Sequence, residues 1–153
     1  MAFKKNFAAF VCQGDTIECE VGGFTCKATL YRDDDTTPPD KRQDGFWPSL
    51  DPKSDGYIGP KSKRTLAREQ AKMQRVMDAW KNDEWHYFGV AVTIWKDDVQ
   101  LTGDYAHAIW GIEGNWPGGR KGSNPNTYFR DVANEELPGA LAAAKAKIAE
   151  LAA

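Results

Sequence analysis

Hydrophobic and polar residues alternate strictly in two neighbouring stretches near the start of the chain, at residues 16–21 and 24–31. A period of two predicts β-strands, and the Gly22-Gly23 pair between the stretches is typical of a two-residue hairpin turn. In that register Cys19 lies opposite Cys26, so both thiols face the core. The pattern therefore predicts an antiparallel hairpin with one buried face.

Two helices and three more strands are predicted after this hairpin. Apolar residues at helical spacing predict a helix over residues 61–82, and Pro60 suits its first turn. Strand-like runs follow at residues 85–96, 99–102 and 105–112. A second helix is predicted over residues 127–153, where Pro138-Gly139 should kink or split it.

These elements predict the fold class. Hairpins and helices are segregated along the chain, which favours α+β over alternating βαβ units. We expect a single domain over residues 1–153, with an antiparallel sheet of about four to five strands packed against two main helices. The stretches 33–60 and 113–126 have no periodic pattern, and irregular stretches of this length are uncommon in compact domains unless they are functional or disordered.

Composition and charge exclude several classes of protein. Hydrophobic residues make up 41% of the chain, charged residues 27%, and the net charge is -2. A dedicated nucleic-acid-binding domain is usually strongly basic, and no run approaches the ~20 apolar residues of a membrane helix. The apolar stretch near the N-terminus is broken by Asn6 and ends at Gln13, too short and too polar for a signal peptide. We expect no membrane contact and a cytoplasmic location.

The three cysteines do not form a recognisable metal or disulfide pattern. Cys12, Cys19 and Cys26 recur every seven residues, without a Cys-x-x-Cys pair. An odd count and this spacing argue against a zinc site and a disulfide framework. We expect free thiols that pack as small apolar groups, and no metal or cofactor.

Residues suited to catalysis are few. Both histidines, His86 and His107, fall in strand-like runs, and the chain lacks the nucleophile-elbow, phosphate-loop and zinc-protease motifs. Asp33, Asp34 and Asp35 form an acidic run that could bind a divalent cation but is more typical of a solvated loop. One alternative is therefore a small hydrolase or nuclease that uses His86 or His107 with Asp33–Asp35.

Basic residues form a stripe along the first predicted helix. Their spacing of three, four, four and three residues places them on one face, away from the apolar stripe. The stripe consists of Lys61, Arg64, Arg68, Lys72 and Arg75. Such a face could bind an acidic protein surface or phosphates, or could simply be solvated. Direct nucleic-acid binding through helix 61–82 is thus a second alternative.

Aromatic residues in the two irregular stretches are further candidates for partner binding. Of six tryptophans, Trp80, Trp85, Trp95 and Trp110 fall in predicted helices or strands and are expected in the core or on a sheet face. The others stand in Trp-Pro pairs, where each ring either packs on the core or contacts a partner. The loop candidates are Phe46, Trp47, Trp116, Arg120 and Lys121.

Two segments resemble small accessory proteins of tailed bacteriophages, prophages and plasmids. One is a strand that leads into the acid-rich residues 31–40; the other is Trp110-Gly111-Ile112-Glu113, followed by a helix with Asp131-Val132-Ala133 and alanine-leucine repeats. The segment 116–119 departs from the pattern, and the motifs carry no catalytic residue. The resemblance implies a mobile-element protein of the host cytoplasm that binds and blocks host machinery, such as an anti-CRISPR inhibitor.

The leading hypothesis is therefore a non-catalytic binding protein that occupies a protein or nucleic-acid-binding surface of a host defence complex. Its expected partner is a host protein or ribonucleoprotein complex, with nucleic-acid contact left open. The alanine-rich final helix also leaves a homodimer open, because small side chains allow close helix packing.

Overall fold

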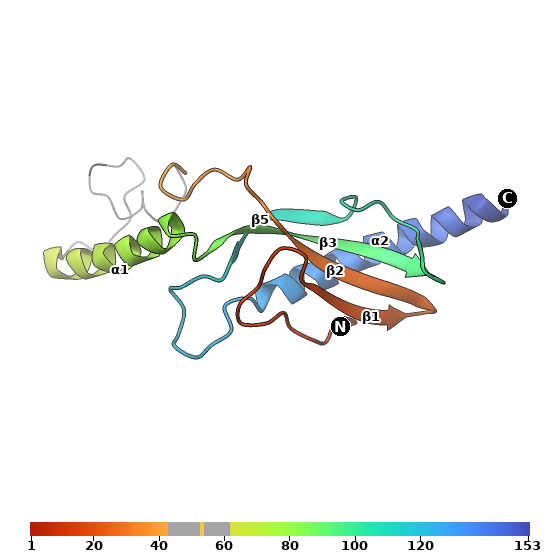
Figure 1. The fold of residues 1–153 in the computed structure, drawn as a ribbon, viewed down its shortest axis with the longest axis horizontal. Helices are drawn as coiled ribbons and strands as arrows, with labels where there is room; N and C mark the ends of the chain where they lie inside the picture. Colours follow the sequence, from red (N-terminus) through yellow and green to blue (C-terminus); the bar gives the residue numbers. More distant parts are fainter. Residues whose placement is uncertain (43–52, 54–61) are drawn as a thin grey trace.

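The computed structural model describes residues 1–42, 53 and 62–153 (Figure 1). In chain order its elements are β1 (Thr16–Val21), β2 (Phe24–Arg32), α1 (Lys63–Lys81), β3 (His86–Lys96), β4 (Val99–Gln100), β5 (Ala108–Gly114) and α2 (Tyr128–Ala152). The five strands form one antiparallel sheet in which β3 lies between β2 on one side and β4 and β5 on the other. The predicted α+β class is confirmed.

The β1–β2 hairpin has the predicted register. Cys19 pairs with Cys26 and Val21 with Phe24, while Gly22 and Gly23 adopt φ values of 57° and 84°. Two positive φ angles are what a two-residue turn of this kind needs, and glycine adopts them without strain. Both thiols are free, and burial raises the pKa of Cys26 to about 12, so this thiol stays protonated.

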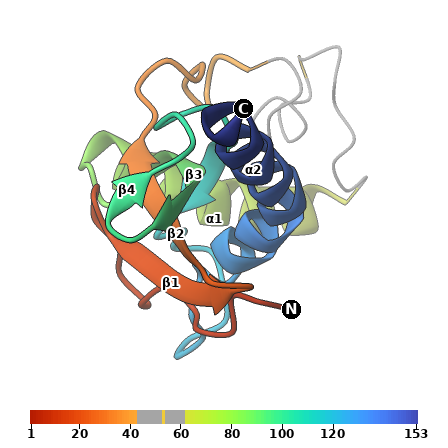
Figure 2. The same cartoon turned by 90° about the vertical axis from the view of Figure 1, so that its right-hand side faces the viewer.

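Helix α2 covers one face of the sheet (Figure 2). The even-numbered residues from Phe24 to Leu30 and from Phe88 to Ile94 belong to this core, and Leu30 and Val90 are fully buried there. Phe3, Phe7 and Val11, from the N-terminal segment that has no regular structure, complete the same core. Their burial was not apparent in the sequence.

Helix α2 runs without interruption through Pro138, so the predicted split does not occur. Pro138 is exposed, whereas Leu137 and Ala140 on either side of it are buried against the sheet. Packing of the flanking residues therefore holds the helix together where proline removes one backbone donor.

Helix α1 lies at the opposite end of the molecule from the C-terminus (Figure 1). It is anchored by a second, smaller cluster in which Val76, Ala79, Trp85 and Tyr87 are buried and Trp80 packs against them. The indole Nε1 of Trp85 donates a hydrogen bond to the Val76 carbonyl at 2.9 Å. An aromatic cluster thus joins α1 to the start of β3.

Some predicted boundaries differ from the observed ones. The β4 strand ends at Gln100, because the backbone N–H of Ile94 donates its hydrogen bond to the hydroxyl oxygen of Thr102 and not to a strand carbonyl at this position. The β5 strand begins at Ala108, so His107 lies in a turn and not in a strand as predicted. The first helix begins after its N-cap Ser62, and residue 61 lies outside the described residues. No helix in the described part of the chain is long and apolar enough to cross a membrane.

Candidate functional site

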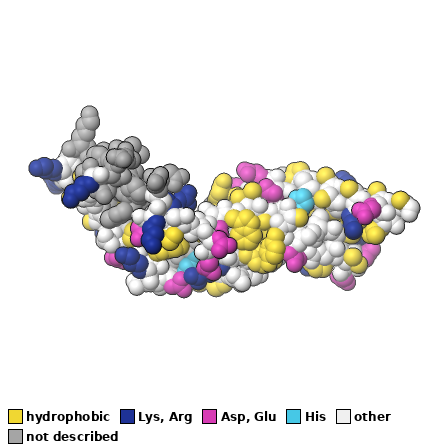
Figure 3. All heavy atoms as spheres, turned by 90° about the horizontal axis from the view of Figure 1, so that it is seen from above, with side chains coloured by type: hydrophobic (Ala, Val, Ile, Leu, Met, Phe, Trp, Pro, Cys, Tyr) yellow, Lys and Arg dark blue, Asp and Glu magenta, His cyan; other side chains and the backbone are white. Residues whose placement is uncertain are grey.

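The predicted basic stripe lies on the solvent side of α1. Arg64, Arg68, Lys72 and Arg75 are all exposed. Residues that follow them near the end of the helix, Val76 among them, are buried in the aromatic cluster. Seen from above, Lys and Arg side chains gather at the α1 end of the molecule (Figure 3). Lys61, Phe46 and Trp47 lie outside the described residues.

The C-terminal half of this stripe borders a groove shared with the loop that contains Trp116. The groove has a volume of about 510 Å³. Lys72 and Arg75 stand on the α1 side, and Pro117, Gly118 and Gly119 form the loop side. We call this hollow the α1 groove. Its remaining lining residues are Val76, Asp78, Ala79, Asn82 and Glu84.

Two predicted surfaces therefore meet at the α1 groove. Arg120 and Lys121 are exposed in the same loop, directly after the residues that line the groove. Arg64 lies nearer the other end of α1 and does not line it. Asp78 and Glu84 were not expected, and they give the groove a mixed charge. Their contribution depends on how the loop folds over the end of α1, which the sequence does not reveal.

Trp116 is partly buried in the aromatic cluster and supports the loop from below. Its ring lies 4.9 Å from that of Trp85, at an angle of 69°. A Cβ on Gly118 would stand 2.5 Å from Nε1 of Trp116, so only glycine allows the loop to fold this closely over the indole. Trp116 thus shapes the groove, and the backbone of 117–119 presents the surface.

Asparagine side chains fix both ends of this loop to the N-terminal segment. The Asn115 side chain accepts from the Val11 N–H at 2.9 Å and donates to the Val11 carbonyl at 3.0 Å. The fully buried Asn126 accepts from the Asn115 N–H at 2.8 Å and donates to the Ala8 carbonyl at 3.0 Å. Amide side chains that replace missing backbone partners hold an irregular segment in one conformation.

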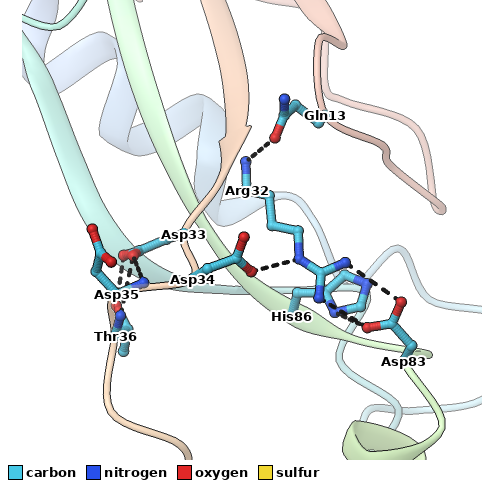
Figure 4. Close-up of polar contacts among 8 residues, drawn as sticks. All are labelled: Gln13, Arg32, Asp33, Asp34, Asp35, Thr36, Asp83 and His86. Carbon is cyan, nitrogen blue, oxygen red and sulfur yellow. Dashed lines mark hydrogen bonds and ion pairs between the residues drawn. The ribbon is translucent and has the colours of Figure 1, made fainter.

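One of the two histidines lies in a cluster of charged residues (Figure 4). The Arg32 guanidinium donates to Asp34 at 2.7 Å and to Asp83 at 3.0 Å. Nδ1 of His86 lies 3.2 Å from Asp83. Burial and the nearby Arg32 lower the pKa of His86, so the imidazole is neutral at pH 7. The contact between Nδ1 and the Asp83 carboxylate therefore joins a neutral ring to a charged group.

The acidic run is divided between two roles. Asp34 joins the Arg32 cluster, whereas Asp33 organises the backbone that follows β2. Asp33 accepts hydrogen bonds from the N–H groups of Asp35, Thr36 and Gly111 and from the Thr36 hydroxyl. Burial alone would raise the pKa of Asp33, but these hydrogen bonds together hold it below its ordinary value. Its carboxylate is structural.

Within the described residues, neither histidine is accompanied by the nucleophile or the metal ligands of a hydrolytic site. His86 and Asp34 contact the same Arg32–Asp83 group, but His107 lies elsewhere, near Gly139 of α2. No Ser, Thr or Cys side chain is hydrogen-bonded to His86 within the described residues. No three His, Cys, Asp or Glu side chains in the part of the chain that the structure describes are placed to hold a metal ion.

Comparisons with protein-family models, with curated proteins and with solved structures each find no match for this chain.

Proposed function

We propose that this chain is a non-catalytic binding protein and that the α1 groove with the adjoining basic stripe is its contact surface for a partner protein. The observation that carries this proposal is the meeting of Lys72 and Arg75 with the loop 117–119 around one hollow. Interfaces combine a concave, preorganised centre with a charged rim that steers encounter. The asparagine-anchored loop supplies the preorganised centre, and the exposed cations supply the charged rim.

The charge of the groove favours a protein partner over nucleic acid. Asp78 and Glu84 line the same hollow as Lys72 and Arg75. A phosphate backbone would be repelled by these carboxylates, whereas a protein surface can present both signs of charge in register. The net charge of -2 agrees with this preference.

The biological setting of the proposal comes from the resemblance to mobile-element accessory proteins. An inhibitor of a host defence complex, of the anti-CRISPR kind, needs only to occupy a surface that the complex requires. Blocking a surface in this way requires complementary shape and charge and firmly anchored contact residues, but no catalytic group. The host cytoplasm would be the site of action.

Quantitative affinity capture from host lysate tests this proposal. Reversal of two groove charges, Lys72→Glu with Arg75→Glu, should reduce the captured partner at least about tenfold, because each lost charge pair becomes a repulsion. The matched control is Lys5→Glu with Lys145→Glu, which changes the net charge equally at two exposed sites outside the groove. The control should capture as the wild type does.

Equal capture by the groove variant and the wild type would contradict the proposal. Treatment of the lysate with nuclease separates the alternatives: a captured protein should persist, whereas loss of all capture would favour direct nucleic-acid binding.

A further inference from the structure

The sheet face that α2 leaves uncovered carries three neighbouring aromatic rings. Tyr31 comes from β2, Trp110 from β5, and Tyr105 from the turn before β5. Their ring centroids are 5.1 to 6.4 Å apart. Tyr105 is 58% exposed and Trp110 44% exposed. We call these three rings the aromatic platform; nothing in the described residues covers it.

The platform is held in place by the backbone beneath it. Gly89 of β3 lies under Trp110, and a Cβ at this position would overlap the six-membered ring. The next residue, Gly111, has a φ of 76°, and its N–H donates to the Asp33 carboxylate at 2.9 Å. A ring fixed in this way loses little conformational entropy when a ligand binds it.

A hollow of about 440 Å³ adjoins the platform on the side of the loop after β2. In Figure 3, acidic side chains lie at the edge of the hydrophobic group in the middle of the molecule. The residues that line the hollow are Arg32, Asp33, Asp34, Asp35, Thr36 and Trp110. It therefore joins one aromatic face to several carboxylates.

The local charge of the hollow is negative. Among the described residues that line it, Arg32 is the cation, and it is directed toward Asp34 and Asp83, which together outweigh its charge. The Asp35 carboxylate is exposed and makes no hydrogen bond or ion pair within the described part of the chain. Asp104 adds to the negative field at the platform: burial, Tyr105 and Asp104 raise the pKa of Tyr31.

We infer that the aromatic platform and its acidic hollow bind an arginine side chain presented by a partner protein. A guanidinium stacks on aromatic faces and hydrogen-bonds carboxylates at the same time. Trp110 and Asp35 offer these two contacts side by side. An apolar segment would strip water from the exposed Asp35 carboxylate, and an acidic segment would be repelled.

This surface is separate from the α1 groove, whose lining carries both signs of charge. None of the residues that line one hollow lines the other. The inference therefore goes beyond the proposed function. Lys72→Glu with Arg75→Glu should leave the platform unaffected, so failure of either proposal can be recognised independently.

A titration followed by nitrogen-15 NMR tests the inference. The probe is a short arginine-containing peptide, and its reference is the same peptide with citrulline, which keeps the shape but lacks the charge. The indole N–H signal of Trp110, assigned from its loss in Trp110→Phe, should shift saturably with the arginine peptide. The citrulline peptide should bind at least about tenfold more weakly, and added salt should weaken the binding of the arginine peptide.

Matched variants localise the effect. Asp34→Asn with Asp35→Asn should weaken the binding of the arginine peptide several-fold. The control, Asp97→Asn with Asp98→Asn, removes the same charge from the β3–β4 turn, where asparagine tolerates the positive φ angles, and should bind as the wild type does.

Three results would overturn the inference: no shift with the arginine peptide, equal binding of both peptides, or unchanged binding in the Asp34/Asp35 variant. A self-association seen by sedimentation that Trp110→Ala abolishes would also overturn it, because a second copy of the chain would then be the occupant.

Discussion

At the scale of single residues, Asp33 shows how one side chain shapes the surface around it. It lies at the end of β2, is 9% exposed, and accepts hydrogen bonds from two elements that are far apart in sequence. Its bond to the Gly111 N–H joins the loop after β2 to β5 and thereby fixes the strand that carries Trp110. The acidic hollow depends on this carboxylate without using it for binding.

Asp33→Ala should therefore destabilise the protein. Three backbone N–H groups lose their acceptor, and charge-assisted hydrogen bonds of this kind imply a loss of about 2–3 kcal/mol in the free energy of unfolding. Denaturant unfolding measures the change. The neighbouring Asp35→Ala removes an exposed carboxylate and should stay within about 0.5 kcal/mol of wild type. Similar losses in both variants would contradict the assigned role of Asp33.

His86 gives a second prediction at this scale, for the dependence of stability on pH. Its pKa in the folded chain lies below the ordinary 6.5, chiefly through burial and then Arg32. The unfolded chain therefore binds a proton first as the pH falls. The stability associated with neutral His86 is present above pH 6.5 and is lost as the pH falls through the folded pKa.

NMR titration of the His86 ring should accordingly give a midpoint below 6.5. In His86→Gln the free energy of unfolding should fall less between pH 7 and pH 5 than in the wild type. A midpoint at or above 6.5 would show that the Asp83 contact outweighs burial.

The sequence patterns predicted only part of this arrangement of side chains. The alternation of residues 24–31 assigned Tyr31 to the side opposite the core, and β2 confirms it. The gathering of Tyr31, Tyr105 and Trp110 depends on the irregular pairing of β3 with β5 between Phe88 and Val90. A shift in register changes which side chains share a face, and local sequence does not encode it. The glycine at position 89, where a side chain would overlap Trp110, is the sequence feature that could have indicated this packing.

At the scale of elements, α1 and α2 are held to the sheet in different ways. Helix α2 is packed along the sheet by residues from Phe129 to Ala144. Among the described residues, helix α1 is held near its C-terminal end, through Val76, Ala79 and Trp80. This leaves its basic face accessible and places the end of the stripe beside the Trp116 loop.

Replacement of Trp85 should loosen α1 selectively. Trp85→Phe removes the hydrogen bond to the Val76 carbonyl and part of the ring that packs on Trp80, at a cost of about 1–2 kcal/mol. Hydrogen exchange should quicken in α1 and remain slow in α2. The control Trp95→Phe changes a tryptophan near the other end of β3 and should leave α1 exchange unchanged. Equal acceleration in both helices would contradict a local anchor.

The main elements were predictable because their periodicity is long and regular. The strands at β1, β2 and β3 and both helices were predicted to within a few residues of their observed bounds. The N-terminal segment was not, because it forms no regular element. Its position depends on partners far along the chain, such as Asn134, whose side chain bonds the Phe3 backbone. Likewise, the asparagines that anchor the Trp116 loop act only through the folded core.

At the scale of the whole molecule, the described residues display two surfaces of opposite character. The α1 groove adjoins a stripe of cations, and the aromatic platform adjoins carboxylates. The net charge of -2 hides this separation. A protein with two such faces can orient a partner as well as bind it, since unlike patches exclude the reversed pose.

The most direct test of the proposed binding role is site-specific photocrosslinking in the host cell. A photoreactive residue replaces Gly119, which lines the α1 groove and has room for a side chain, and, as control, Ala146 on the exposed side of α2. We predict that position 119 crosslinks to one discrete host protein and that Lys72→Glu with Arg75→Glu abolishes this product. Crosslinking of the same protein from position 146 alone, or no discrete product from position 119, would contradict the α1 groove as the contact surface.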